Sequence, residues 1–279
     1  MIDVFDHMEL KLYVARFQRL GCDWRTADSL YYKQVIPFTR IYFPVEGGAW
    51  MRHSGQEFTL RPGHLYLLPA HIPVDVECDD RLVKYWTHFQ IGFFDIRLDM
   101  LALLKPRFVS PAADPEVTAK LFDRLVALAH EEDWQPPGGI ERMEAYSLLR
   151  LLLLPFFDGA AAALGSEAGQ HKKLVELLVH IEKHLDQPLT LEVLARQAHL
   201  HPGYLSNWFA RHMGQPLIQY CNNRRIRKAV DLIWEDQLSF AEIARRLGGD
   251  DPAAFSRLFK RHLGTTPSAM RKNMRKSVK

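Results

Sequence analysis

The stretch AAFSRLFKRHLG, from Ala253 to Gly264, is similar to an earlier stretch of the same chain, GYLSNWFARHMG, from Gly203 to Gly214. The two copies share Ser, Phe, Arg, His and Gly at aligned positions, and their bulky apolar residues recur at the spacing of one helix face. The segments before them, LARQAHLH and IARRLGGDD, also align, with one extra residue in the second. The sequence therefore predicts two copies of a unit in which a tight turn joins two short helices.

Local signals predict where the helices of this region begin. From Leu174 onward the chain has helical periodicity, with a first helix over Leu174 to Leu185 and a long amphipathic helix between the two copies. N-cap residues and first-turn prolines mark the helix starts. These signals are Thr190, His201-Pro202, Pro216, Ser239 with Glu242 as a capping box, and Asp251-Pro252.

The spacing within each copy is that of a helix-turn-helix unit. A small residue, Ala195 or Ala244, stands where the two helices cross, and the second helix presents a polar face that suits a DNA major groove. Asn207 and Arg257 are the side chains able to make bidentate contacts, to adenine and guanine respectively. The residues expected to contact DNA are Ser206, Asn207, Arg211, Ala253, Ser256, Arg257, Lys260 and Arg261. The alternative is an ordinary solvated face.

Basic residues on and near the central helix can be interpreted in the same way as the basic residues of the second helices. We interpret Arg224, Arg225, Arg227 and Lys228 as phosphate contacts or solvated charge.

Charge is distributed unevenly along the 279 residues, although the net charge is only +3. Residues 1–170 carry 17 Lys and Arg against 23 Asp and Glu, whereas residues 171–279 carry 19 against 10. A basic C-terminal third indicates a polyanionic partner, most often nucleic acid. Three scattered cysteines and the lack of an apolar stretch long enough for a signal or a membrane span predict a cytoplasmic protein without membrane association.

The segment from about Leu174 to Arg271 resembles the DNA-binding domain of AraC/XylS-type transcriptional regulators. The residues that carry the resemblance are LTLEVLARQAHLHPGYLSNWFARHMGQPLIQYCNNRRIRKAVDLI and SFAEIARRLGGDDPAAFSRLFKRHLGTTPSAMRK. The resemblance implies seven helices, two helix-turn-helix motifs joined by a long central helix, and two second helices that enter adjacent major-groove segments of double-stranded DNA. Gly249 departs from the family, which usually has Phe there, and this implies a looser second turn.

The N-terminal half has a different periodicity. Short apolar runs broken by turn residues, from 31 to 94, predict antiparallel strands, and helical patterns follow over Val117 to His130 and Ile140 to Phe157. The segment GQEFTLRPGHLYLLPAHIP resembles the cupin-like jelly-roll effector domain of the same family, with His64 where Asp is usual. We expect an α+β multidomain protein with a β jelly-roll followed by an all-α double helix-turn-helix domain. The expected boundaries are 1–158, a linker at 159–171, and 172–279.

Strand alternation selects candidate ligand-binding residues in the jelly roll. Arg40, Tyr42 and Glu46 are expected on one face, Trp50 on a face with Arg52, and Trp86 with His88. Aromatic faces beside a few hydrogen-bonding groups suit a small polar effector, such as a sugar. The alternative is a sheet face that is simply wet. The candidate ligand-binding residues are Arg40, Tyr42, Glu46, Trp50, Trp86 and His88.

Other classes of function are less well supported by the sequence. His53 and Glu57 loosely match a cupin metal motif, but Met51 replaces its other histidine and no downstream histidine motif appears, so neither metal nor cofactor is expected. Catalytic triads and phosphate loops are absent. We therefore expect a non-enzymatic, ligand-responsive regulator, a homodimer in which the helices after the jelly roll pair, with RNA polymerase as a further partner. The alternatives are a cupin metalloenzyme with a DNA-binding appendage and a constitutive DNA-binding protein with a dimerisation domain.

Overall fold

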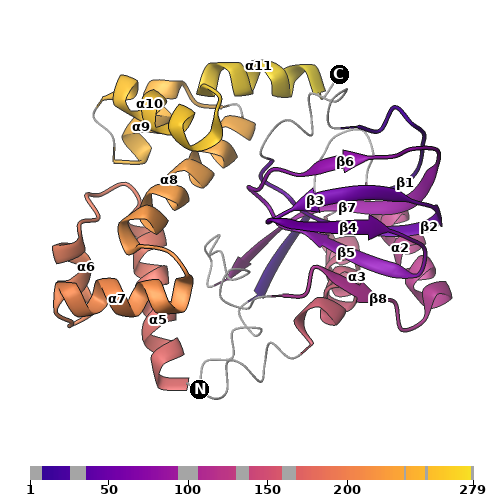
Figure 1. The fold of residues 1–279 in the computed structure, drawn as a ribbon, viewed down its shortest axis with the longest axis horizontal. Helices are drawn as coiled ribbons and strands as arrows, with labels where there is room; N and C mark the ends of the chain where they lie inside the picture. The colour runs from indigo at the N-terminus through magenta and orange to yellow at the C-terminus, as the bar shows by residue number, and fades with distance from the viewer. Residues whose placement is uncertain are drawn as a thin grey trace. The chain divides into compact units, whose positions relative to one another are not determined.

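The chain forms a β-rich unit and a helical unit, which are described separately (Figure 1). The β-rich unit comprises mainly Met8–Gly92 and Leu104–Ala162, and the helical unit mainly Ala163–Lys279. The computed structural model describes residues 8–25, 36–93, 106–129, 138–158, 168–235, 237–248 and 251–277. No helix within these ranges is long and apolar enough to cross a membrane.

Two antiparallel sheets build the β-rich unit. The five-stranded sheet has the order β1 (Met8–Leu20), β7 (Leu82–Phe93), β2 (Thr39–Gly47), β5 (His64–Leu68) and β8 (Val109–Pro111). The three-stranded sheet has the order β4 (Gln56–Leu60), β3 (Ala49–His53) and β6 (Asp75–Glu77).

The two sheets bury apolar side chains between them. Tyr66 and Leu68 of the larger sheet share one buried cluster with Met51 and Val76 of the smaller sheet. The opposite face of the larger sheet packs on helices α2 (Pro115–Leu128) and α3 (Gly139–Phe157), where the Phe43 and Phe122 rings stack with centroids 5.7 Å apart. The expected fold class, a β domain followed by a helical domain, is confirmed.

Two boundaries differ from those expected. The β region begins with β1 at Met8, well before residue 31, although its alternating buried residues Leu10, Leu12 and Val14 carry the ordinary strand signal. Helix α5 begins at Ala168, inside the stretch expected to be a linker, because its first turn is polar and shows no apolar periodicity. Residues 159–167 lie outside the described residues.

Seven helices lie in the described part of the helical unit, and the predicted side-chain caps at Thr190, Ser239 and Asp251 are present. The Thr190 hydroxyl accepts a hydrogen bond from the Val193 amide, and Ser239 and Glu242 form the expected capping box. The helices are α5 (Ala168–Lys183), α6 (Leu191–Gln197), α7 (Pro202–Met213), α8 (Leu217–Trp234), α9 (Phe240–Arg246), α10 (Pro252–Leu263) and α11 (Pro267–Ser277).

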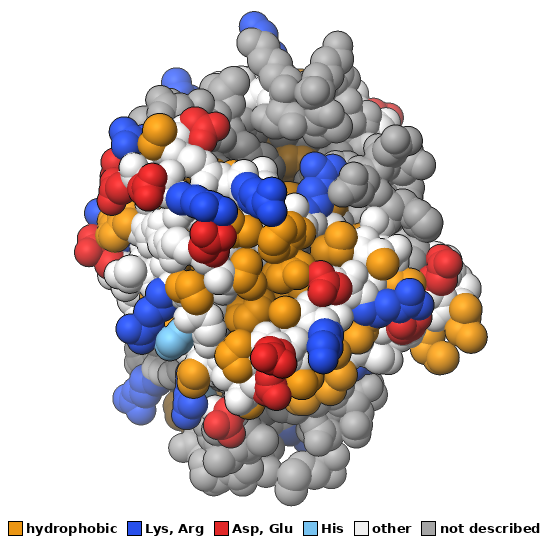
Figure 2. Space-filling model, turned by 90° about the vertical axis from the view of Figure 1, so that its right-hand side faces the viewer, with side chains coloured by type: hydrophobic (Ala, Val, Ile, Leu, Met, Phe, Trp, Pro, Cys, Tyr) orange, Lys and Arg blue, Asp and Glu red, His pale blue; other side chains and the backbone are white. Residues whose placement is uncertain are grey.

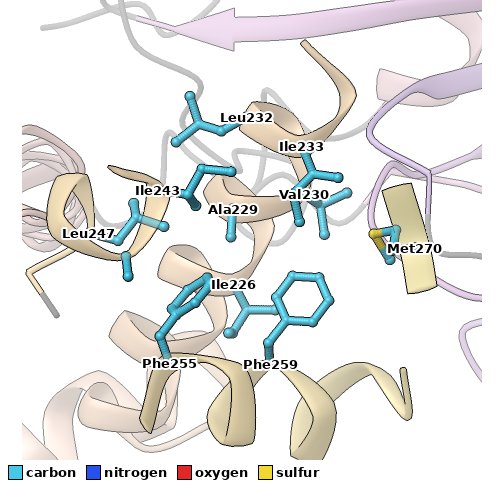
Figure 3. Packing of buried hydrophobic residues seen from close by; sticks show 11 residues of the cluster. Ile226, Ala229, Val230, Leu232, Ile233, Ile243, Leu247, Phe255, Phe259 and Met270 are labelled. Carbon is cyan, nitrogen blue, oxygen red and sulfur yellow. The ribbon is translucent and has the colours of Figure 1, made fainter. Parts of the chain in front are cut away.

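Helix α8 contributes to the cores of both helix-turn-helix copies. Near its start, the Tyr220 ring packs edge-on against Phe209 of α7, with centroids 5.4 Å apart. Farther along, Ile226 and the residues after it share a cluster with Phe255 and Phe259 of α10, whose rings point toward α8 in Figure 3. One helix therefore sets the positions of both second helices.

Two arginines of α8 are structural, which corrects their interpretation as DNA contacts or solvated charge. Arg224 is 5% exposed and binds Glu182 of α5 through two hydrogen bonds. Burial disfavours its charged form, but the carboxylate of Glu182 outweighs this effect, and the pKa of Arg224 is raised. Arg225 donates to the carbonyls of Leu185 and Gln187. The two side chains join α8 to α5 and to the segment after it.

Removing one partner of the Arg224–Glu182 pair should destabilise the helical unit strongly. Arg224→Met leaves a buried carboxylate without its partner, so we expect a loss of about 3–5 kcal/mol in the free energy of unfolding. The double variant Arg224→Met/Glu182→Met removes both charges and should be more stable than Arg224→Met alone. Urea unfolding of the full chain measures both values. A loss below about 1 kcal/mol for Arg224→Met would show that the pair is not a buried structural interaction.

Candidate DNA interface and effector site

Helices α7 and α10 begin and end in the same way. The side chain of His201 accepts a hydrogen bond from the backbone amide two residues on at 3.3 Å, and that of Asp251 does the same at 2.8 Å. Each helix ends at a glycine in the left-handed region, Gly214 at φ 69° and Gly264 at φ 70°. Because a side chain strains this conformation, the shared glycine of the two copies has a structural cause. Gly249, in the second turn, lies outside the described residues.

The two helices bury one face and expose the other, as predicted. Leu205 and Phe209 are fully buried in α7, and Phe259 in α10. Of the residues expected to contact DNA, Ser206 and Ser256 are half-buried and the others are exposed. The exposed set is Asn207, Arg211, Ala253, Arg257, Lys260 and Arg261. The structure therefore brings a polar face to the surface in each copy, with one arginine on α7 and three basic side chains on α10.

Tyr204 is a further candidate that the sequence interpretation did not include. It is 59% exposed and precedes Asn207 by three residues, so both side chains and Arg211 lie on one side of α7. Its aligned position in α10 holds Ala254. Its spacing relative to Asn207 and Arg211 would have identified it from the sequence.

Arg257 has an internal partner. Its guanidinium lies 3.5 Å from the carboxylate of Asp251, and both side chains are more than half exposed. Hydrogen bonds from the amides of Ala253 and Ala254, with a smaller contribution from Arg257, lower the pKa of Asp251. Asp251 therefore holds the start of α10 and neutralises part of the charge of Arg257 in the DNA-free protein.

Four of the six candidate ligand-binding residues lie together inside the β sandwich. Antiparallel pairing places Arg40 opposite His88 and Tyr42 opposite Trp86, and directly paired residues share a face. Arg40, Tyr42 and His88 are almost fully buried, whereas Trp86 is half-buried and donates from Nε1 to Gln18 at 2.8 Å. These four residues, Arg40, Tyr42, Trp86 and His88, are called the interior row, and the row reaches the surface at Trp86.

Glu46 does not join this row, although alternation places it with Arg40 and Tyr42. A bulge between Pro44 and Glu46 adds one residue to β2, so Glu46 pairs with Val83 and lies on the opposite face. It is exposed and forms an ion pair with Arg81 at 2.9 Å. Strand alternation fails here because a bulge cannot be recognised from the apolar pattern.

Trp50 is also separated from the row. It lies on β3 of the smaller sheet, where Met51 and His53 are buried and Trp50 and Arg52 point outward. The guanidinium of Arg52 lies 5.5 Å from the centroid of the Trp50 ring and pairs with Asp75 at 2.9 Å. The expectation that Trp50 and Arg52 share a face is confirmed, but this is the outer face of the sandwich.

Two buried residues of the sandwich, Lys84 and His53, were not among the ligand-binding residues expected from the sequence. Lys84 is 1% exposed, and its Nζ lies 3.4 Å from the centroid of the Tyr42 ring and 3.8 Å from that of Trp24. His53 is 2% exposed and stacks on Phe58 with ring centroids 4.7 Å apart. Alternation with Trp86 would have placed Lys84 inside, but a lysine is rarely buried.

Burial and the charge of Arg40 both disfavour further positive charge in this interior. Burial first, and the charge of Arg40 second, lower the pKa of His53 to about 4 and hold that of Lys84 well below its ordinary value. The pKa of His88 is lowered by burial and by the charges of Arg40, Lys84 and Arg16. Within the described ranges, Arg40 Nε and His53 Nε2 have no hydrogen-bond partner.

The residues of the loose metal motif point in different directions. Glu57 pairs with Arg52 across the strands, while His53 pairs with Gln56, so the two candidate ligands lie on opposite faces of the smaller sheet. Among the residues that the structure describes, no group of three or more His, Cys, Asp or Glu could hold a metal ion.

Comparison with known proteins agrees with both units. Residues 17–153 match the AraC-like ligand binding domain, and residues 194–273 match a helix-turn-helix domain. The HTH-type transcriptional regulator YfiF of Bacillus subtilis is 33% identical over 246 residues, covering 84% of this chain and 76% of its own length. The arabinose operon regulatory protein of Escherichia coli is 25% identical over 84% of this chain and 80% of its own length. The Msm operon regulatory protein of Streptococcus mutans is 24% identical over 84% of each.

A solved structure shows the same arrangement of domains in the chain. The fatty-acid-bound ToxT of Vibrio cholerae aligns over 97% of both chains with a TM-score of 0.53 at 12% identity, which supports the fold alone. The matches to both domains, together with YfiF, show that this chain belongs to the AraC family of ligand-binding, helix-turn-helix transcriptional regulators.

Proposed function

We propose that one chain reads two successive major-groove segments, through α7 and α10. The observation that carries this proposal is the repeated helix, whose two copies have the same pattern of N-cap hydrogen bond, a glycine at the C-terminal end and a polar outer face that is most basic on α10. Asn207 and Arg257 would contact bases, whereas Arg211, Lys260 and Arg261 would contact phosphates. The protein would act in the cytoplasm, and RNA polymerase would be its partner at the promoter.

The β sandwich would bind a small polar effector at the interior row. Arg40, Tyr42, Trp86 and His88 lie together and reach the surface at Trp86, which gives a ligand both a ring face and hydrogen-bonding groups. The name of the arabinose operon relative favours a sugar-related effector and control of carbohydrate genes. The effector would act through its different affinities for two states of the regulator.

Helix α3 offers a surface for a second copy of the chain. Ile140, Met143, Leu151 and Leu154 are each at least half exposed, and their spacing places them along one side of the helix. In Figure 2, apolar side chains gather on the face that lies to the right in Figure 1, where α2 and α3 are drawn. Exposed apolar patches of this kind mark protein interfaces, so we propose a homodimer that pairs through α3.

Substitution of two arginines of α10 should separate base reading from phosphate anchoring. On a duplex selected from a random library by the unmodified protein, Arg257→Ala should cost roughly 1–3 kcal/mol of binding and relax the preference at one base pair. Arg261→Ala should weaken all sequences about equally and lower the salt slope by about 1. Binding titrations against single-base variants of the duplex measure both effects. An unchanged base preference in Arg257→Ala would remove its assignment.

The two half-buried tryptophans give a matched test of the effector site. A ligand at one hundred times its dissociation constant stabilises the folded state by about 2.7 kcal/mol, so a thermal-shift screen of mono- and disaccharides should detect it. Trp86→Ala and His88→Ala should abolish the shift, whereas Trp50→Ala, on the outer face, should keep it. A shift lost only in Trp50→Ala would place the ligand on the outer face.

The dimer surface can be tested without DNA or effector. Leu154→Glu places a charge in the apolar stripe of α3 and should raise the dimer dissociation constant at least about tenfold, which corresponds to 1.4 kcal/mol. Ile218→Glu, an exposed apolar position of the helical unit, is the control. Sedimentation velocity over a concentration series measures the change. Equal dissociation constants for Leu154→Glu and the unmodified chain would exclude α3 as the interface.

A further inference from the structure

Two basic side chains inside the β sandwich have no acidic partner among the residues that the structure describes. Arg40 is 2% exposed and Lys84 is 1% exposed, and the pairing of β2 with β7 places them on the same inner face, opposite His88 and Pro44. No aspartate or glutamate among the described residues forms an ion pair with either of them. The Arg224–Glu182 pair shows how the same chain neutralises a buried cation elsewhere.

Burial of two like charges without a counter-ion is unfavourable. The rings of Tyr42 and Trp24 beside Lys84 Nζ give a partial cation–π stabilisation, but they carry no net charge. The effect on ionisation agrees with this geometry, since burial and Arg40 lower the pKa of Lys84. The arrangement therefore costs stability that a bound group of opposite charge would restore.

The hydrogen-bonding groups of this interior are mostly donors. Arg40 Nε is buried without a partner among the described residues, and Lys84 offers an ammonium that needs acceptors. His88 lies opposite Arg40 across the strands, and His53, whose Nε2 also lacks a described partner, lies near enough to Arg40 for that charge to lower its pKa. A neutral polyol needs donors and acceptors together, whereas an anion needs donors and positive charge.

We propose that the effector is a small organic anion, whose carboxylate or phosphate group binds between Arg40 and Lys84 while the rest of the molecule lies toward Trp86. This inference rests on the proposed effector site and specifies its ligand class. Arg40 supplies directed N–H donors, and Lys84 supplies a point charge. The half-buried Trp86 lies between Lys84 and His88 on β7, where the row meets the surface.

Lysine substitution tests the proposal before any ligand is known. Lys84→Met keeps the volume and removes the buried charge, so the ligand-free full chain should melt about 3 °C or more above the unmodified protein. Arg52→Met, which removes a cation from the outer face of the smaller sheet, is the matched control and should show no such gain. A lower melting temperature for Lys84→Met would show that Lys84 is already neutralised within the protein, and would overturn the proposal.

Matched probes then test the ligand class in the full chain. D-galacturonate against D-galactose, and glucose 6-phosphate against glucose, differ in the anionic group and separate carboxylate from phosphate. At least one anionic probe should raise the melting temperature more than its neutral partner does. Lys84→Met should reduce the affinity for that anionic probe at least about tenfold. If the anionic probes do no better than the neutral ones, the anion proposal is wrong. A neutral sugar whose effect disappears in Trp86→Ala would still support the effector site.

Discussion

Helix α8 is the constraint on which the helical unit depends, because its side chains form part of two hydrophobic cores, one with α7 and one with α10. Its first turns pack against Phe209 of α7, and its later turns pack against Phe255 and Phe259 of α10 (Figure 3). A helix is stiff, so this sharing fixes the separation and relative rotation of the two exposed faces. The buried pair of Arg224 and Glu182 holds α8 against α5, so the positions of both exposed faces depend on a pair that is itself buried in the helical unit.

The β-rich unit shows a different use of buried charge. In the helical unit a buried arginine forms an ion pair with a carboxylate. Inside the sandwich, Lys84 lies against aromatic rings, and the charge of Arg40 lowers its pKa. A protein that only needed stability would fill this space with apolar side chains. Binding sites often contain groups that lower the stability of the folded protein. The half-buried Trp86 connects this interior to the surface.

Much of this structure could be predicted from local chemistry, and the exceptions have physical causes. The caps at Thr190, Ser239 and Asp251 and the outward faces of α7 and α10 follow from short-range rules that tertiary contacts do not override. Glu46 was misplaced because a bulge shifts the alternation, and Trp50 because alternation does not say which sheet a strand joins. The burial of Arg224 and Lys84 depends on partners distant in sequence, Glu182 on α5 and the rings of Trp24 and Tyr42. Residue type alone places such side chains in solvent.

The central claim is that one chain carries two recognition helices held at a fixed spacing by α8. Methylation interference on a duplex selected by the full protein tests it most directly, because it maps major-groove guanines that must remain free for binding. The account predicts two groups of interfering bases for each bound chain, about 10 base pairs apart on one face of the DNA. Insertion of about 5 base pairs between them, half a helical turn, should abolish simultaneous interference at both. A single group for each chain, or tolerance of the insertion, would contradict the account.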